Sequence, residues 1–285
     1  MTVLSILKGA PPHFSFEFFP PKTEKGEKRL FETISDMKSL EPGFVSITCG
    51  AGGSTRNRTV EWAHKIKGEI GVEVVAHMTC LGQTRDSLAT ELRSMREGGI
   101  ENVLALRGDP PKDAAPAPEG TCRYAIDLIR LVAEHHPAAC VLAACYPEGH
   151  VDAESRQQDL LRLKEKCDAG VHVLVTQLFF DNSAYFEFVK RARDIGIDQP
   201  IVPGIMPVTD LHQVQRFTSM CGATIPSGLL ESLRACGDDK AAVARVGVEY
   251  AVAQCRELLA SGVPGIHFYT LNQRPSTRLV VEALR

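Results

Sequence analysis

Short apolar runs alternate along the chain with longer segments in which apolar residues recur at helical spacing. The short runs are rich in β-branched and aromatic residues, a composition typical of buried strands. Most successive runs begin about 30 residues apart, which is the length of one strand–helix unit. The pattern predicts eight strands, near residues 14–19, 44–49, 74–79, 103–107, 141–145, 173–178, 201–205 and 266–270.

The segments between these strands have the periodicity of amphipathic helices, for example 25–40, 55–70, 84–98 and 155–169. Gly98, Gly99 and Gly170 stand where such helices would end. The spacing lengthens once, over residues 206–265, which predicts two or three helices between strands seven and eight. Eight strands alternating with helices favour an α/β fold, a (β/α)8 TIM barrel forming one domain over residues 1–285. An open doubly wound sheet is the alternative.

The composition is that of an ordinary globular protein, with 44% hydrophobic and 24% charged residues in a chain of 285. The net charge of −3 argues against a nucleic-acid partner, because phosphate binding usually leaves a basic surface. No apolar run approaches the roughly 20 residues that cross a membrane, and the apolar residues 3–7 are too few for a signal peptide. The nine cysteines include no CxxC pair, so we expect reduced thiols in a cytoplasmic protein rather than disulfides or a zinc site.

One carboxylate interrupts the first predicted strand, where Glu17 stands in the run Phe-Ser-Phe-Glu-Phe-Phe-Pro-Pro over residues 14–21. The two prolines end the strand because proline has no backbone N–H to donate. An unpaired carboxyl group buried among aromatic rings is favoured in its protonated form. Such a group can act as a general acid, so this strand predicts proton donation by Glu17. The alternative is an edge strand from which Glu17 points into solvent.

Polar residues gather where the predicted strands end, and in a barrel these C-terminal ends form the active-site face. The strand starts are mostly aliphatic. Any one of the polar residues could be a satisfied buried group, but together they predict a polar mouth at this end of the barrel. The polar positions are Glu17, Thr48, the glycine-rich loop 49–54, His77, Thr79, residues 107–109, 146–150 and 204–207, Gln177, and residues 267–272.

Some of these positions also have a purely structural interpretation. His77 could be a core histidine. The loop 50–53 lacks the lysine of a P-loop, so an ordinary strand–helix turn fits it as well. The segment Arg107-Gly-Asp109 could present a cation and a carboxylate to a ligand that approaches the glycine, or it could form an internal ion pair.

Other candidates for chemistry are weaker. Lys166 would ordinarily lie on a solvated helix face, and His135 and His136 stand near a helix end, where we expect them to be solvated. No grouping of His, Asp or Glu has the spacing of a metal site, so no metal is expected. The residues alone therefore predict a barrel enzyme with a candidate glutamic acid, without naming a substrate.

Six segments, read together and in order, resemble methylenetetrahydrofolate reductases. They are Phe16-Glu-Phe-Phe-Pro-Pro21, Arg107-Gly-Asp109, Ala144-Cys-Tyr-Pro-Glu148, Thr176-Gln-Leu-Phe-Phe-Asp181, Pro203-Gly-Ile-Met-Pro207 and His267-Phe-Tyr-Thr-Leu-Asn272. The resemblance covers nearly the whole chain and is to the short bacterial type, which consists of the catalytic barrel alone. It implies a cytoplasmic, FAD-dependent oxidoreductase that reduces 5,10-methylenetetrahydrofolate to 5-methyltetrahydrofolate with NADH or NADPH, feeding methionine synthesis.

The resemblance also implies roles for individual residues. Glu17 matches the general acid of the family, which helps to protonate the folate N10 so that the five-membered ring opens. Asp109 matches a carboxylate that lies beside the flavin and hydrogen-bonds the pterin, so it is a catalytic as well as a binding position. Non-covalent FAD binding is implied for Thr48, Ala51, His77, Arg107, Gly108, Asp109, Tyr124, Ala125, Tyr146, His150, Asp159 and Lys166.

Substrate contacts are implied at three further positions, Gln177, Gln213 and Phe217. Gln177 matches a residue shared by the folate and the nicotinamide, and Phe217 an aromatic that packs on whichever ligand is present. One site serving both substrates in turn implies ping-pong kinetics. Relatives form dimers or tetramers, so a homo-oligomer is expected, whereas neither its size nor the preferred nicotinamide can be inferred from the sequence.

The chain departs from the family pattern at four positions. Cys49 stands where a tyrosine is common, and Gln273 stands where a folate-binding arginine is expected. Arg162 and Glu165 replace an asparagine and an arginine on the predicted helix 155–169. Glu165 would bring a negative charge toward the FAD phosphates, so FAD binding is expected to survive but to be weaker.

Two other functions would use the same fold. A metal- or Schiff-base lyase would need a metal cluster or a lysine at a strand end, and the sequence shows neither. A folate- or flavin-binding subunit that works only within a larger complex would carry the same motifs, and this alternative stays open.

Overall fold

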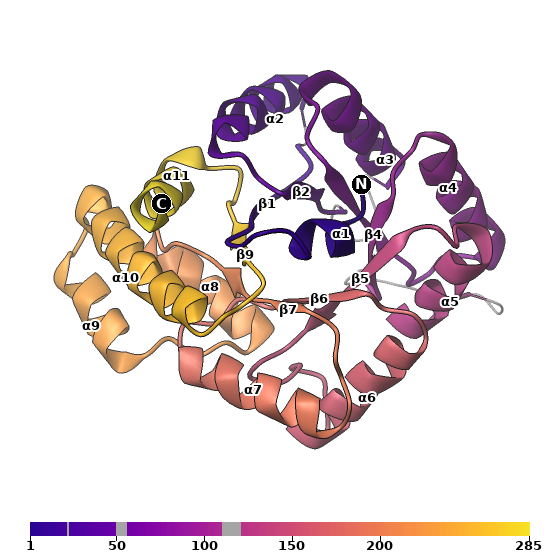
Figure 1. Ribbon diagram of the computed structural model, residues 1–285. Helices are drawn as coiled ribbons and strands as arrows, with labels where there is room; N and C mark the ends of the chain where they lie inside the picture. The colour runs from indigo at the N-terminus through magenta and orange to yellow at the C-terminus, as the bar shows by residue number, and fades with distance from the viewer. Residues whose placement is uncertain (22, 50–55, 110–120) are drawn as a thin grey trace.

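The computed structural model describes residues 1–21, 23–49, 56–109 and 121–285. Parallel strands form a central barrel, and helices surround it (Figure 1). The strands pair in the order β7-β6-β5-β4-β3-β2-β1-β9-β8. They are β1 (Phe14–Phe18), β2 (Phe44–Ile47), β3 (Val74–Thr79), β4 (Asn102–Leu106), β5 (Cys140–Cys145), β6 (Val173–Thr176), β7 (Ile201–Val202), β8 (Gly204–Ile205) and β9 (Ile266–Tyr269). This arrangement confirms the predicted TIM-type barrel.

The predicted seventh strand is split in two at Pro203. β7 pairs with β6, and β8 pairs with β9, so the chain itself closes the barrel between them. Pro203 has no N–H to donate. The next N–H, that of Gly204, donates to the Thr176 side-chain oxygen at 2.9 Å. A Cβ on Gly204 would lie 2.5 Å from the Thr176 carbonyl oxygen, so only glycine fits where the two strands meet.

Helices lie between the strands along the chain, and side chains cap several of their first turns. Thr23, Thr84 and Ser155 each accept a hydrogen bond from the backbone N–H three residues on, which satisfies a donor that the helix leaves unpaired. The helices are α1 (Val3–Leu7), α2 (Glu24–Met37), α3 (Arg56–Lys65), α4 (Arg85–Glu97), α5 (Ala125–His135), α6 (Arg156–Asp168), α7 (Asn182–Asp194), α8 (Leu211–Cys221), α9 (Ser227–Ala235), α10 (Lys240–Ala260) and α11 (Arg274–Leu284), with a 3₁₀ turn at Lys38–Leu40 and a π-helical turn at Ile66–Ile70.

Side chains of β1 alternate between two environments. Phe14, Phe16 and Phe18 point outward into the core between the strands and the helices. Because successive side chains of a strand point to opposite faces, Ser15 and Glu17 point into the barrel. The phenylalanines therefore fix the strand against the helical layer and leave the interior face to polar residues.

The interior is apolar at the N-terminal ends of the strands. Phe44, Val75 and Leu104 belong to a core cluster there that also contains Val3 of α1. The Val3 N–H donates to the Asn102 side-chain oxygen at 2.7 Å, and Asn102 begins β4. The helix α1 thus closes this end, and the polar side chains lie at the opposite, C-terminal end.

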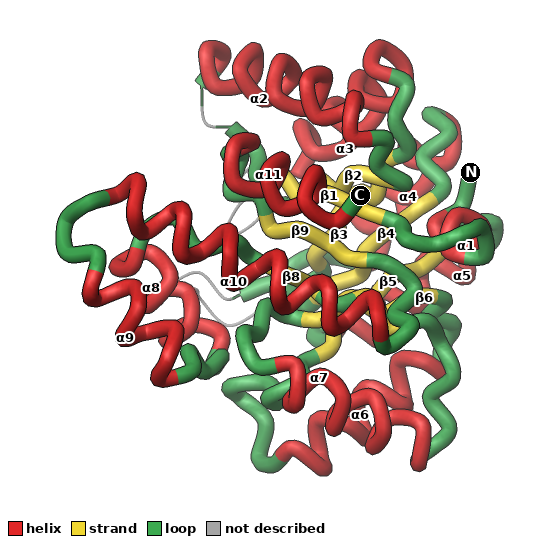
Figure 2. The backbone as a smooth tube through the Cα atoms, turned by 60° about the vertical axis from the view of Figure 1, so that its left-hand side comes forward, coloured by secondary structure: helices red, strands yellow, loops and turns green. Residues whose placement is uncertain are grey.

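A third core cluster joins α8, α9 and α10 to the barrel. It contains Leu178, Met206 and Val208 from the segments after β6 and β8. The three helices occupy the interval between β8 and β9, as the long spacing predicted, and Figure 2 shows them gathered on one side of the barrel. Gly247 lets α10 approach closely, since a Cβ there would meet the Val208 carbonyl oxygen. In the described part of the chain, no helix is long and apolar enough to span a membrane.

Candidate functional site

Glu17 lies inside the barrel near the C-terminal end of β1. It is 7% exposed, and its Cα is paired in register with Ser46 on β2 and Tyr269 on β9. The alternative of a solvent-facing edge strand is therefore wrong. The expected surroundings also differ, because the phenylalanines of the strand face the other way and polar side chains take their place.

Two histidines approach the same oxygen of Glu17. His77 Nε2 from β3 lies 3.4 Å from Glu17 Oε2, and His267 Nε2 from β9 lies 3.5 Å from it. Both distances are longer than a normal hydrogen bond, so these are close polar contacts. Burial lowers the pKa of His77, with the charge of Glu17 opposing this shift and His267 adding to it. His77 is therefore neutral near neutral pH, so Glu17 is not paired there with a full positive charge.

A second polar group lies at the ends of β4 and β5 and on α6. Arg107 Nη2 is 3.0 Å from Asp152 Oδ2. The Asp152 N–H donates to His150 Nδ1 at 3.0 Å, and the His150 N–H donates to Asp159 Oδ2 at 3.2 Å. The ring of Tyr146 meets that of His150 edge-on, with centroids 4.7 Å apart. We call these five residues the rim cluster. Arg107 pairs with Asp152 here, not with Asp109 as the structural interpretation supposed.

Lys166 points inward from α6 and is half-buried. Its Nζ donates to the Ala144 carbonyl oxygen at 2.9 Å, at the end of β5. Burial lowers the pKa of Lys166, opposed by attraction to Cys145 and Asp159. Burial likewise raises the pKa of Asp159, opposed by the His150 N–H and by Lys166. The expectation of a solvated lysine is therefore wrong, and Lys166 lies half-buried beside Asp159 of the rim cluster.

Gly108 and Thr48 lie at strand ends in the same mouth. Gly108 has a φ of +82°, and a Cβ there would lie 3.0 Å from the Thr79 Cβ, so the position requires glycine. The Thr48 hydroxyl is buried and has no hydrogen-bond partner within the described residues. Asp109 is exposed on the segment after β4.

The predicted substrate residues lie on the α8 side of the barrel. Gln177 follows β6, and its side-chain oxygen accepts the neighbouring Leu178 N–H at 2.8 Å. Gln213 stands in the first turn of α8, and Phe217, one turn further, packs against the third core cluster. A small cavity separates the β5 and β6 ends from the end of α8, and its lining residues are Tyr146, Pro147, Glu148, Gly149, Gln177, Leu178, Cys221 and Ala223.

The remaining predicted FAD-binding positions have fewer contacts with the mouth or lie outside the described residues. Tyr124 is 63% exposed at the start of α5, with Ala125 beside it. The carbonyl of Tyr124 accepts a bond from the Cys80 thiol at 3.3 Å, which keeps its backbone near the end of β3. Ala51 and the glycine-rich loop 50–53 lie outside the described residues.

Two residues that the sequence analysis did not assign to the site have contacts within it. Both His267 and Glu148 were named only within polar strand-end segments, without a role of their own. Glu148 accepts the Thr224 N–H with both carboxylate oxygens, at 3.0 and 3.1 Å, and so joins the β5 end to the segment after α8. For His267, the available signal was a histidine inside a predicted strand, three residues before its end. Nothing local in the sequence predicts the contact of Glu148, because its partner is 76 residues away.

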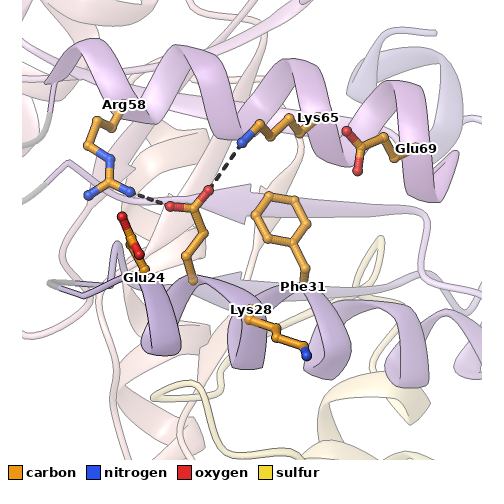
Figure 3. A pocket seen from close by; sticks show the side chains of 7 residues that line it. Glu24, Lys28, Phe31, Arg58, Lys65 and Glu69 are labelled. Atoms are coloured by element: carbon orange, nitrogen blue, oxygen red, sulfur yellow. Dashed lines mark hydrogen bonds and ion pairs between the residues drawn. The ribbon is translucent and has the colours of Figure 1, made fainter.

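A separate cavity of about 450 Å³ lies outside the barrel between α2 and α3 (Figure 3). Glu27, one of its lining residues, pairs with Arg58 and, at 3.2 Å, with Lys65. The aromatic side chains of Phe31 and Trp62 lie under the two cations, Lys65 and Arg58 respectively. Glu27, Arg58 and Lys65 therefore pair with one another and link α2 to α3 outside the mouth.

The fold and the site define a parallel α/β barrel with a buried acid and a polar, partly cationic rim at the C-terminal ends of its strands, which is the arrangement of barrel enzymes. The family model for methylenetetrahydrofolate reductase matches residues 3–285. The chain belongs to the methylenetetrahydrofolate reductase family.

Named relatives agree with this assignment. The chain is 40% identical over 282 residues to methylenetetrahydrofolate reductase (NADH) 1 of Arabidopsis thaliana, covering 95% of this chain and 48% of the relative. It is 39% identical over 271 residues to 5,10-methylenetetrahydrofolate reductase of Escherichia coli, covering 95% and 90%. The chain thus spans about half the length of the plant relative and nearly all of the bacterial one.

A solved structure shares the fold. The uncharacterized protein from Clostridium thermocellum that binds two copies of 5-methyl-5,6,7,8-tetrahydrofolic acid has a TM-score of 0.66. The alignment covers 99% of this chain and 97% of that one, at 15% identity. At this identity the comparison supports the barrel architecture alone.

Proposed function

We propose that this protein reduces 5,10-methylenetetrahydrofolate to 5-methyltetrahydrofolate with NADH or NADPH, using non-covalently bound FAD, and so supplies methyl groups for methionine synthesis in the cytoplasm. The observation that carries the proposal is Glu17, an acid buried at the C-terminal mouth of the barrel in a chain that belongs to this family. An acid in that position matches a reaction that must begin by protonating a ring nitrogen.

The residues of the mouth fit a flavin dinucleotide. Arg107 of the rim cluster and Lys166 beside it would supply positive charge toward a diphosphate. The unpartnered hydroxyl of Thr48 and the close approach that Gly108 permits would accommodate a polar ring edge. Bound there, FAD would accept a hydride from the nicotinamide and deliver it to the folate.

Side chains of the protein would supply the proton that the reaction needs. Glu17 would donate its proton to the folate N10, which weakens the bond between N10 and the bridging carbon and opens the ring. The carboxylate that remains would lie against two histidine nitrogens rather than in water. Asp109 would hydrogen-bond the pterin and hold it against the mouth.

The α8 side would hold the rest of the substrate. Gln177 and Phe217 would meet the nicotinamide and the folate in turn, and Gln213 would meet the folate. Because one site would serve both, the kinetics would be ping-pong. Gln273 lies at the start of α11 in an exposed position, so an amide replaces the cation expected there.

Anaerobic spectroscopy of the purified protein tests the proposal. The protein should be yellow, should be bleached by NADH or NADPH, and should regain its colour when 5,10-methylenetetrahydrofolate is added. Yellow protein that reacts with neither substrate would instead support a binding subunit. Colourless protein with stoichiometric metal would support a lyase.

The assembly state is a separate part of the proposal. We expect a homodimer or homotetramer, and light scattering of the purified protein measures its mass directly. A monomer at micromolar concentration would contradict this expectation without affecting the proposed reaction.

A further inference from the structure

His267 is held inside the barrel by the serine that precedes the buried acid by two residues. Ser15 Oγ lies 2.8 Å from His267 Nδ1, and the Ser15 hydroxyl donates, over a longer distance of 3.5 Å, to the Ile266 carbonyl oxygen. Ser15 is 2% exposed and His267 1% exposed, so water does not compete for these groups. The ring of His267 also stacks on Phe44, with centroids 5.8 Å apart, which fixes its plane.

One arrangement of protons uses every one of these contacts. In it the Ser15 hydroxyl donates to the Ile266 carbonyl oxygen, which only accepts, across the 3.5 Å contact. The Ser15 oxygen then accepts the N–H of His267 Nδ1. The other nitrogen, Nε2, is left without a proton and faces Glu17 Oε2 at 3.5 Å.

An unprotonated imidazole nitrogen can accept a hydrogen bond from a carboxylic acid, whereas it repels a carboxylate. We propose that His267, oriented by Ser15, is a positioning residue that holds Glu17 in its proton-donating form. The chain of donors runs from Glu17 to His267, from His267 to Ser15, and from Ser15 to the backbone. This inference rests on the proposed function, in which the Glu17 proton moves to the folate nitrogen and leaves a carboxylate behind.

The other described groups around Glu17 bring no full positive charge to it. His77 contacts the same oxygen from β3 and is neutral near neutral pH. The Tyr269 hydroxyl from β9 donates to the Thr176 carbonyl oxygen at 2.5 Å, so its proton is not available to a Glu17 carboxylate. From β2, Ser46 and Thr48 contribute only hydroxyl groups, and among the described residues no lysine or arginine pairs with Glu17.

The tautomer of His267 can be measured without any substrate. Nitrogen-15 NMR of histidine-labelled protein distinguishes protonated from unprotonated ring nitrogens, and the His267→Gln variant identifies the signals of His267 among the nine histidines. We expect a protonated Nδ1 and an unprotonated Nε2 at neutral pH. A protonated Nε2 would overturn the proposal.

Kinetics supply the second test. In the folate half-reaction, His267→Leu should be at least about tenfold slower than wild type near pH 8, with a smaller loss near pH 6, because acid restores the protonated carboxyl group. His267→Gln should lose less of this rate, since its amide oxygen can still accept a hydrogen bond from Glu17. Ser15→Ala should show the same pH dependence as His267→Leu. Equal losses at every pH would indicate a merely structural role and would overturn the proposal.

Ser46→Ala is the matched control, because it removes a buried hydroxyl from the neighbouring strand without touching His267. It should leave the pH dependence of the folate half-reaction unchanged. The proposed function and the role of His267 can fail separately. If wild type reduces no folate, although its flavin is reduced by the nicotinamide, the proposed function fails, whereas the NMR result still decides the tautomer of His267.

Discussion

The interior around Glu17 and the rim cluster are built in different ways. Glu17, His77 and His267 belong to β1, β3 and β9, with β2 between β1 and β3, and the hydrogen-bonded register of these strands sets their spacing. The rim cluster and Lys166 lie on segments after the strands and on α6, and side-chain hydrogen bonds hold them together. The proton donor is thus fixed by the scaffold, and the cationic rim by its own contacts. We therefore expect changes in the two regions to affect different steps.

Replacing the buried acid should have the largest effect. Glu17→Gln keeps the size of the side chain and removes its proton-donating group, so the folate half-reaction should slow by at least about 10²-fold. Flavin reduction by NADH or NADPH should stay near the wild-type rate. Stopped-flow absorbance of each half-reaction measures both, and equal loss in the two would show that Glu17 acts only structurally.

Removing the inward-pointing lysine should act on the cofactor instead. Lys166→Ala deletes a half-buried cation, and its loss should raise the FAD dissociation constant by about tenfold or more, as for one charge-assisted hydrogen bond. Fluorescence titration of the apoprotein with FAD measures this constant.

Lys164→Ala is the control for this change, because Lys164 lies on the same helix and pairs with the exposed Asp168. Its FAD affinity should match that of wild type. If both variants bind FAD as wild type does, Lys166 is not a cofactor contact.

The buried His77 should make the protein sensitive to mild acid. Its pKa in the folded protein lies below the ordinary 6.5, chiefly because of burial. As the pH falls below 6.5, the unfolded chain binds this proton before the folded one does, so stability falls toward the lower folded pKa. The slope is at most about 1.4 kcal/mol per pH unit for one group.

Urea denaturation at several pH values between neutral and mildly acidic measures this effect. His77→Gln should lose less stability than wild type over the same interval, because it has no proton to bind. Parallel losses in the two proteins would mean that other groups govern the acid response.

The smallest effect should come from the exposed pair on α6. Arg162 and Glu165 contact each other at 3.0 Å and are 65% and 50% exposed. Glu165→Gln should change the free energy of unfolding by less than about 0.5 kcal/mol. It should lower the FAD dissociation constant about two- to threefold, because it frees a cation and removes a negative charge near the phosphates.

Glu282→Gln on α11 removes a comparable carboxylate, one that pairs with Arg278 on a different helix. Its FAD affinity should not change. An identical gain of affinity in both variants would mean that net charge, rather than the position of Glu165, controls binding.

The strands and helices could be predicted because their periodicity is local. The break of the seventh strand at Pro203 was not predicted, although the proline was visible. What makes two short strands there is the hydrogen bond from Gly204 to the Thr176 side chain, and the sequence gives no indication of this tertiary contact. The three helices before β9 could be predicted only from the length of the interval.

The site could be predicted in part, because a strand end identifies a position but not what surrounds it. His136, expected to be solvated, is 4% exposed, and its Nε2 lies 2.8 Å from the Ile100 carbonyl oxygen. Lys166 was expected on the solvated face by residue type alone. Both errors have one cause: the environment of a helical side chain is determined by neighbours far away in the sequence.

The two-residue alternation of β1 makes this strand intolerant of insertions and deletions. A single residue gained or lost between Phe14 and Glu17 would reverse the remaining side chains. The carboxyl group of Glu17 would then enter the apolar layer between the strands and the helices, and a phenylalanine ring would take its place inside the barrel. Evolution can exchange individual residues here, but it cannot change the length of the strand without losing stability and catalysis in one step.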